Sequence, residues 1–356
     1  MRRKSRAVRV GGLKVGGKNP ILVQSMTNTD TKDVKATIDQ IKRLQKAGCE
    51  IIRVSVPDKE SALALKEIKK GIDMPLVADI HFDWQLALES IKNGADEIRI
   101  NPGNIGDKEK VMAIAKSAKK NKIAIRVGIN GGSLQRDILH KYKDKVTPEG
   151  LVESALRSIK LLEDCNFKDI IISIKSTDVL TTIKSHQLLA EKGDWPFHIG
   201  ITEAGRARAG IVKSTLGIGG LLMSGLGDTV RVSLSGDPEE EVKVGWDILK
   251  SLKLREKGLS IISCPTCSRT KIPVEQIAKF LEDNSDEFEK EPIKIAVMGC
   301  IVNGLGEAKE ADLAFVGIEN GKASFFRKGK FVKNLDPNKI ISFIKELISS
   351  DNLYKI

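Results

Sequence analysis

Aromatic residues are scarce in this chain of 356 residues, of which Phe, Trp and Tyr together make up 4%. Proteins that stack on exposed bases interleave aromatic with basic side chains, so the excess of 59 Lys and Arg over 47 Asp and Glu does not by itself indicate a nucleic-acid partner. Long apolar runs are lacking too, because no stretch approaches the ~20 residues of a membrane-spanning helix and no apolar signal core follows the basic first residues. We expect a protein that binds neither nucleic acid nor membrane.

Cysteine occurs only five times, at positions 49, 165, 264, 267 and 300. An odd count in a chain long enough to bury a full core argues against a disulfide framework, so we expect the reducing environment of the cytoplasm. A hydrophobic content of 41% excludes intrinsic disorder. The net charge of +12 fits a lysine-rich surface together with an anionic ligand, and the length fits more than one domain.

Short β-rich segments alternate with helical ones such as 34–48 and 84–95 over most of the chain. The β-rich segments are 20–27, 51–57, 75–81, 97–103, 124–130, 170–176, 198–204 and 229–235. Eight such units are typical of a (β/α)₈ barrel, whereas a doubly wound sheet would favour a Gly-rich dinucleotide fingerprint that the chain lacks. We predict an α/β fold in which residues 1–253 form a TIM barrel, with residues 7–19 as a β-hairpin that closes its bottom.

Polar side chains lie near the carboxyl ends of these strands, where a barrel places its active site. Because side chains alternate along a strand and helices cover the outer face, these groups should point into the lumen. Five cations from different strands would meet there: Arg53, Arg99, Arg126, Lys175 and Arg231. Buried like charges are unfavourable unless they are neutralised. Either each cation pairs with a neighbouring carboxylate such as Glu97, or together they bind a polyanion. A phosphate fits the second alternative, because the planar guanidinium of Arg can bind its oxygens in pairs. We predict a phosphate or diphosphate substrate.

Further polar residues of the same strands complete the predicted substrate site: Asp79, His81, Asn101, Asn130, Ser173, His198, Thr202 and Ser233. The two histidines are suited to positioning a substrate or carrying protons. Glu203 comes at the predicted end of the seventh strand, a usual place for a catalytic acid or base.

A second domain is predicted over residues 254–356, where the pattern changes to a small α+β order. A strand ends in Cys264-x₂-Cys267, a helix occupies 273–284, and the strand 293–299 ends at Cys300. A Gly-flanked turn that carries Glu307 follows, then strands over 314–318 and 322–328 and a final helix over 337–350. Three thiolates select zinc or an iron–sulfur cluster, and Glu307 is the best local candidate for a fourth ligand because no histidine follows His198.

The segments VADIHFD, EIRINPGN, GITEAG, VRVSLSG, SCPTCSRT and MGCIVNGLGEA, taken in order, resemble those of the hydroxymethylbutenyl diphosphate synthase family, also called IspG or GcpE. The resemblance covers essentially the whole chain, whose length is similar to that of the compact bacterial form of the family. It implies an oxidoreductase of the methylerythritol phosphate route to isoprenoids. The implied reaction opens and dehydroxylates methylerythritol cyclodiphosphate with two electrons.

The resemblance also implies residue roles. It implies a 4Fe–4S cluster held by Cys264, Cys267, Cys300 and Glu307, diphosphate binding by the five cations, a catalytic Glu203 and a substrate contact at Asn303. Reduced ferredoxin or flavodoxin is the implied electron donor. The implied assembly is a head-to-tail homodimer, in which the cluster domain of one chain covers the barrel of the other. Leu305 stands where the family turn usually has proline, so we expect Glu307 to be less rigidly placed.

Two other interpretations remain at the level of sequence. One is another phosphate-binding barrel synthase, pterin- or aldolase-like, with a zinc-stabilised tail. The other is a basic, zinc-containing nucleic-acid-binding protein, which would show salt-sensitive binding and contain no iron.

Overall fold

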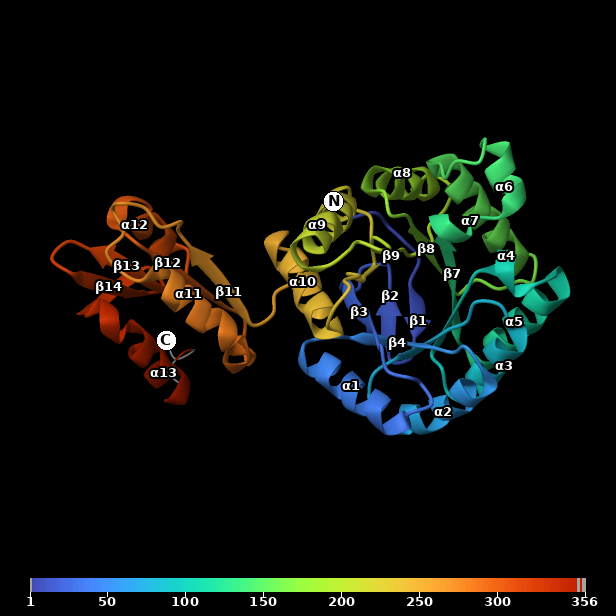
Figure 1. Ribbon diagram of the computed structural model, residues 1–356, viewed down its shortest axis with the longest axis horizontal. Coiled ribbons are helices and arrows are strands. Elements are labelled where there is room, and N and C mark those ends of the chain that lie inside the picture. The colour runs from blue at the N-terminus through green and yellow to red at the C-terminus, as the bar shows by residue number, and fades with distance from the viewer. Residues whose placement is uncertain (1, 351–352, 354–356) are drawn as a thin grey trace. The chain divides into compact units, whose positions relative to one another are not determined.

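The computed structural model describes residues 2–350 and residue 353. The chain divides into two compact units, Met1–Arg255 and Glu256–Ile356, which are described separately (Figure 1). No helix in the described part of the chain has the length and apolar character needed to cross a membrane.

Eight parallel strands form the first unit, in the order β8-β7-β6-β5-β4-β3-β10-β9. A parallel bridge between Ile172 and Phe197 joins the two ends of this order and closes the sheet. The predicted (β/α)₈ barrel is therefore confirmed. Its strands are β3 (Leu22–Met26), β4 (Ile51–Ser55), β5 (Leu76–Asp79), β6 (Glu97–Ile100), β7 (Ala124–Asn130), β8 (Ile170–Lys175), β9 (His198–Ile199) and β10 (Thr229–Val230).

Helices surround this barrel and cover its outer face (Figure 1). Most begin at an Asp or Thr whose side chain accepts a hydrogen bond from a backbone N–H of the first turn, which satisfies a donor that the helix leaves free. The long helices are α1 (Val34–Lys46), α2 (Lys59–Lys70), α3 (Trp84–Lys92), α5 (Lys108–Asn121), α7 (Pro148–Glu163), α8 (Val179–Ala190), α9 (Ala207–Met223) and α10 (Pro238–Ser251). The short helices α4 (Pro102–Ile105) and α6 (Arg136–Lys141) and the 3₁₀ turn Gly131–Ser133 lie in loops after β6 and β7.

An antiparallel hairpin packs at the amino-terminal end of the barrel. It consists of β1 (Val8–Val10) and β2 (Leu13–Val15). Its buried valines form an apolar cluster with residues near the starts of five barrel strands: Leu22, Ile51, Val77, Ala124 and Ile171. The hairpin end of the lumen is therefore filled mainly by apolar side chains.

The last two barrel strands are much shorter than the predicted segments 198–204 and 229–235, with two residues each. The pairing of β9 with β10 continues for one more backbone hydrogen bond, from the N–H of Arg231 to the carbonyl of Ile199. At Gly200 a Cβ atom would overlap the carbonyl oxygen of Arg231, so the two backbones approach too closely for ordinary strand packing. Thr202, Glu203 and Ser233 consequently lie in loops.

A five-stranded sheet with helices forms the second unit. Strands β11 (Leu259–Ser263), β12 (Ile293–Met298) and β13 (Leu313–Ile318) run parallel, and β14 (Lys322–Arg327) and β15 (Lys330–Leu335) continue the sheet antiparallel. The helices are α11 (Val274–Asp283), α12 (Ile301–Lys309) and α13 (Ile340–Ser349). Phe315, Phe325 and Phe343 pack with their rings together, which anchors α13 on the sheet.

Two features of this unit differ from the prediction. Residues 301–309 form helix α12 rather than a Gly-flanked turn, with Cys300 at its N-cap position. Gly304 is needed for packing and not for a turn, because a Cβ atom there would overlap Val316 of β13. Leu305 therefore continues a helix, for which leucine is well suited, instead of loosening a turn. Strand β15 was not predicted, because it lies at the sheet edge with nearly every residue exposed.

Truncating the hairpin valine Val10 should destabilise the barrel. Val10→Ala removes two methyl groups from a fully buried position, so the free energy of unfolding should fall by about 2 kcal/mol. All three tryptophans, Trp84, Trp195 and Trp246, belong to the barrel unit, so tryptophan fluorescence during urea unfolding follows this unit alone. Lys14→Ala, at an exposed hairpin position, is the control and should change stability by less than about 0.5 kcal/mol. Equal stability of both variants would contradict the role of the hairpin as a plug.

Candidate active site

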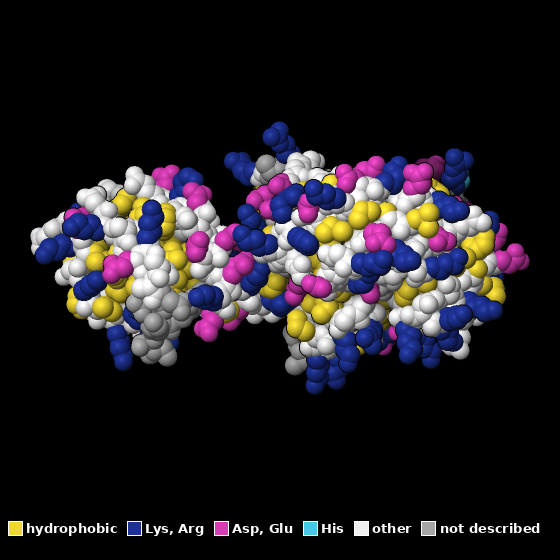
Figure 2. Space-filling model, turned by 90° about the horizontal axis from the view of Figure 1, so that it is seen from below, with side chains coloured by type: hydrophobic (Ala, Val, Ile, Leu, Met, Phe, Trp, Pro, Cys, Tyr) yellow, Lys and Arg dark blue, Asp and Glu magenta, His cyan; other side chains and the backbone are white. Residues whose placement is uncertain are grey.

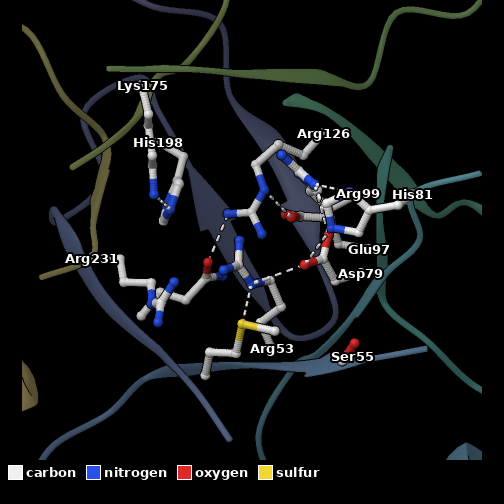
Figure 3. A network of polar contacts seen from close by, with 12 residues as sticks. Arg53, Ser55, Asp79, His81, Glu97, Arg99, Arg126, Lys175, His198 and Arg231 are labelled. Carbon is white, nitrogen blue, oxygen red and sulfur yellow. Dashed lines mark hydrogen bonds and ion pairs between the residues drawn. The ribbon is translucent and has the colours of Figure 1, made fainter. Parts of the chain in front are cut away.

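Most of the charged residues predicted for the barrel mouth lie together in a network of polar contacts (Figure 3). Arg53, Arg99, Arg126 and Lys175 come from β4, β6, β7 and β8, and Arg231 follows β10. The register places Arg99 level with Arg126 and Asp79, so neighbouring strands deliver these side chains at one height.

Asp79 is the anionic centre of one half of the network. Its two oxygens lie 3.1 Å from Arg99 Nη1 and 3.8 Å from Arg53 Nε, and His81 Nε2 is 3.5 Å away. Burial opposes ionisation of Asp79, but the charge of Arg53, the hydrogen bond with His81 and the charge of Arg99 outweigh it, and the pKa of Asp79 lies well below its ordinary value. The carboxylate therefore stays charged and holds two arginines and a histidine together.

Arg126 is almost fully buried in the lumen. Its Nε is 3.0 Å from Glu97 Oε1, and its Nη1 donates to Gln24 Oε1 at 2.7 Å. Burial lowers the pKa of Arg126 to about 10 despite the nearby Glu97, so the guanidinium remains charged at neutral pH. Burial also raises the pKa of Glu97 against the opposing charge of Arg126. We call Gln24, Glu97 and Arg126 the Arg126 layer.

Lys175 and His198 form a second buried pair. Lys175 Nζ is 3.2 Å from His198 Nε2, and His198 Nδ1 is 2.8 Å from the hydroxyl of Thr229. Burial, together with the surrounding arginines, holds the pKa of both groups well below their ordinary values, so His198 is neutral. If Nε2 accepts from Lys175, the ring proton lies on Nδ1 and is donated to Thr229.

Arg231 is held by a carboxylate from outside the strands. Its Nη2 is 3.4 Å from Glu241 Oε2, and Glu241, on α10, also accepts from Ser25 and from the N–H of Leu234. Burial lowers the pKa of Arg231 to about 10, with Arg53 adding to the effect. Nothing in the chain pattern distinguishes Glu241 from the other acidic residues in the first turn of α10, so sequence reasoning missed it.

Cations outnumber anions at the mouth. In the described part of the chain the carboxylates paired with the five cations are Asp79, Glu97 and Glu241, and Lys175 has no carboxylate within ion-pair distance. Arg126 Nη2 and Arg231 Nε are buried and have no hydrogen-bond partner among the described residues. Neighbouring carboxylates therefore neutralise only part of the positive charge, and the donors without a partner are suited to bind an anion.

A missing side chain at Gly128 makes room for this network. Gly128 lies between Arg126 and Asn130 on β7, and a Cβ atom there would overlap the guanidinium of Arg99. The Asn130 oxygen, in the amide orientation that satisfies its neighbours, accepts from Arg99 Nη2 at 3.2 Å. Sequence reasoning overlooked Gly128, although a glycine inside a strand signals a close approach.

The other predicted residues lie around this network without all joining it. Asn101 is buried and its side chain accepts from the N–H of Gly103 at the start of α4. Ser173 is buried on β8, level with Gly128. Glu203 is exposed in the loop after β9 with a φ of 51°, and in the described chain it has no hydrogen bond or ion pair with the network. Substrate contacts by these residues and by His198, Thr202 and Ser233 stay predictions.

The cysteines of the second unit lie at the carboxyl ends of adjacent parallel strands. Cys264 follows β11, Cys267 is exposed three residues later, and Cys300 follows β12. The N–H of Gly299 donates to Cys264 Sγ at 3.0 Å, which brings the two segments together. Glu307 lies roughly 10 Å along the helix axis from Cys300, given the rise of an α-helix. No three His, Cys, Asp or Glu side chains converge for a single metal ion among the residues described.

Known families match both units. Residues 5–246 match the GcpE TIM-barrel domain, and residues 260–350 match the GcpE protein C-terminal domain. The chain belongs to the GcpE family. The family resemblance found in the sequence is thereby confirmed.

Relatives named within the GcpE family are similar over nearly their full length. The chain is 55% identical to the 4-hydroxy-3-methylbut-2-en-1-yl diphosphate synthase (flavodoxin) of Caldanaerobacter subterraneus subsp. tengcongensis, over 94% of this chain and 93% of that protein. It is 53% identical to the protein of the same name from Clostridium acetobutylicum, over 95% and 96%. A type I 3-dehydroquinate dehydratase from Clostridium difficile, 16% identical, superimposes with a TM-score of 0.50 over 70% of this chain and 98% of that one. That likeness shows the barrel fold alone.

Filling the space at Gly128 should weaken anion binding. Gly128→Ala forces the Arg99 guanidinium to move, and losing one charged hydrogen-bonding partner should lower the affinity for inorganic pyrophosphate roughly tenfold. Isothermal titration calorimetry measures this. Gly132→Ala is the matched control, because a Cβ atom there meets nothing within 4 Å. Unchanged affinity of Gly128→Ala would remove Arg99 from the anion site.

Proposed function

We propose that this protein converts 2-C-methyl-D-erythritol 2,4-cyclodiphosphate into 4-hydroxy-3-methylbut-2-en-1-yl diphosphate by two-electron reductive ring opening and dehydroxylation. The observation that carries the proposal is the cluster of five cations at the mouth of a GcpE barrel, in one chain with a three-cysteine unit. Relatives at 50–55% identity bear the corresponding synthase name. A different phosphate-binding synthase with a zinc-stabilised tail is not favoured by this family assignment.

The barrel residues bind and orient the diphosphate. Arg53, Arg99 and Arg231 present planar guanidinium groups that can bind phosphate oxygens in pairs. Lys175, which has no carboxylate partner in the described chain, offers a further donor, and a bound anion would favour its charged form. As the cyclic diphosphate opens, negative charge develops on the released phosphate oxygen, and fixed cations in a buried site stabilise that charge.

The second unit would hold a 4Fe–4S cluster through Cys264, Cys267 and Cys300. Three thiols at neighbouring strand ends are the soft donors that such a cluster requires, and the Gly299 N–H is already directed at one of the sulfurs. Glu307 is the proposed fourth ligand and must approach the cysteines from α12. When bound, the cluster supplies electrons to the substrate. Asn303, exposed on the same helix, is a proposed substrate contact.

Reduced flavodoxin is the proposed electron donor, because the relatives' names specify it; reduced ferredoxin is the other candidate. Both are acidic proteins, which suits a chain of net charge +12. Figure 2 shows Lys and Arg spread over the visible face with Asp and Glu between them, so the charge is not gathered in one patch there. All five cysteines are free thiols, consistent with the proposed reducing cytoplasm.

A homodimer is the proposed assembly. Val212, Leu216 and Met223 are exposed on α9, and Leu180 is exposed on the adjacent α8. Large apolar side chains at helical spacing on neighbouring helices are typical of a surface that another chain covers. A second copy of this chain fits the head-to-tail arrangement that the family resemblance implies.

Iron content tests the cluster and the reaction together. Anaerobically purified protein should contain about four iron atoms per chain and form the product with a chemical reductant. Cys300→Ser should lose both iron and turnover. Cys165→Ser, half-buried on the barrel, is the matched control and should keep both. Turnover by a colourless, iron-free protein would sink the proposed function.

Glu203 is the proposed acid that gives a proton to the departing oxygen. Glu203→Gln keeps the shape of the side chain but cannot exchange a proton, so kcat should fall by roughly 100-fold. Pyrophosphate affinity should not change, because Glu203 has no contact with the cation network. Glu191→Gln, exposed at the end of α8, serves as control. Normal turnover of Glu203→Gln would reject the assignment.

A further inference from the structure

The Arg126 layer crosses the barrel from one wall to the other. Arg126 starts from β7, and its guanidinium reaches Gln24 on β3. Three strands separate β7 from β3 in either direction around the closed sheet, so these strands are opposite walls. Figure 3 shows the guanidinium of Arg126 reaching into the centre of the network, with Glu97 beside it.

This layer separates two kinds of interior. Below it, the hairpin valines pack with Leu22, Ile51, Val77, Ala124 and Ile171 in an apolar cluster. The register places Arg126 level with Arg99, and Arg99 level with Asp79, so Arg126 borders both the apolar cluster and the charged residues around Asp79. Arg126 is the most completely buried of the five cations.

The nitrogens of Arg126 differ in their partners. Nη1 donates to Gln24 and Nε lies 3.0 Å from Glu97 Oε1 as an ion pair, whereas Nη2 is buried and has neither kind of partner in the described chain. One hydrogen bond and one ion pair on a planar guanidinium restrict its orientation, and this orientation sets the direction of the third nitrogen.

We propose that Gln24 and Glu97 are positioning residues that hold Arg126 across the lumen, so that its free nitrogen meets the diphosphate and sets how deeply that group enters. The proposal rests on the proposed function. Glu97 supplies the countercharge, and Gln24 supplies a neutral acceptor on the far wall.

A purely structural role does not account for the layer. A buried ion pair is in general no more stable than well-packed apolar side chains of the same volume. The apolar cluster directly beneath shows that this barrel can fill its lumen without charge. The polar layer therefore lowers or leaves unchanged the stability of the barrel, which is typical of residues retained for binding.

A double-mutant cycle on the full-length, anaerobically purified protein tests the proposal, with inorganic pyrophosphate as the probe. Gln24→Met keeps the side-chain length but removes the acceptor, and should weaken binding roughly tenfold. Arg126→Ala should weaken it at least as much. In the Arg126→Ala background the Gln24→Met change should alter affinity less than about twofold, because Gln24 acts through Arg126. Gln45→Met, exposed on α1, is the matched control.

Two further readouts separate positioning from folding. With the cyclodiphosphate as substrate, Gln24→Met should raise KM and leave kcat unchanged, as expected when ground-state and transition-state binding fall together. Replacing the whole layer, as Gln24→Met with Glu97→Met and Arg126→Met, should give a barrel at least as stable as wild type by tryptophan fluorescence, with no detectable pyrophosphate binding.

The failures are distinguishable. Wild-type protein that does not bind pyrophosphate would overturn the anion site of the proposed function, and this inference with it. Wild-type binding with an unaffected Gln24→Met variant, or with additive effects in the cycle, would overturn the positioning role alone. A triple variant that is clearly less stable than wild type would assign the layer to the barrel's stability instead.

Discussion

Crowding of like charge in a buried lumen is the constraint on which the rest of the site depends. Two unit charges 4 Å apart repel by about 4 kcal/mol at an effective dielectric constant of about 20. The barrel limits this cost with Asp79, Glu97 and Glu241, each of which contacts one or two cations. The cations still outnumber these carboxylates, so the repulsion is only partly offset, and the proposed diphosphate would relieve the remainder.

Strand periodicity was enough to predict most of this site. Arg53, Asp79, Arg99, Arg126 and Lys175 were predicted because alternate residues of a barrel strand face the lumen. Glu241 was out of reach, because its role depends on how α10 packs and not on a local pattern. Gln24 has an uncharged side chain, and its contact with Arg126 joins residues 102 positions apart.

Glycine was the main source of error in the second unit. Gly304 and Gly306 suggested a turn, but Gly304 is where α12 lies closest to β13. Intrinsic preference gave way to packing, as tertiary contacts commonly override propensity. The positions of Cys264 and Cys300 were nevertheless predicted correctly as strand ends, because the strands themselves have continuous apolar sequences.

The hairpin at the barrel bottom determines the route by which a ligand enters and leaves the site. Because its valines fill the amino-terminal end of the lumen, a ligand bound by the mouth cations can enter and leave from one side only. In the proposed reaction substrate and product both carry a diphosphate, so each would occupy the same cations and the same passage. The product must then leave before the next substrate molecule can enter. Tight binding of the diphosphate, which captures the substrate, also slows release of the product.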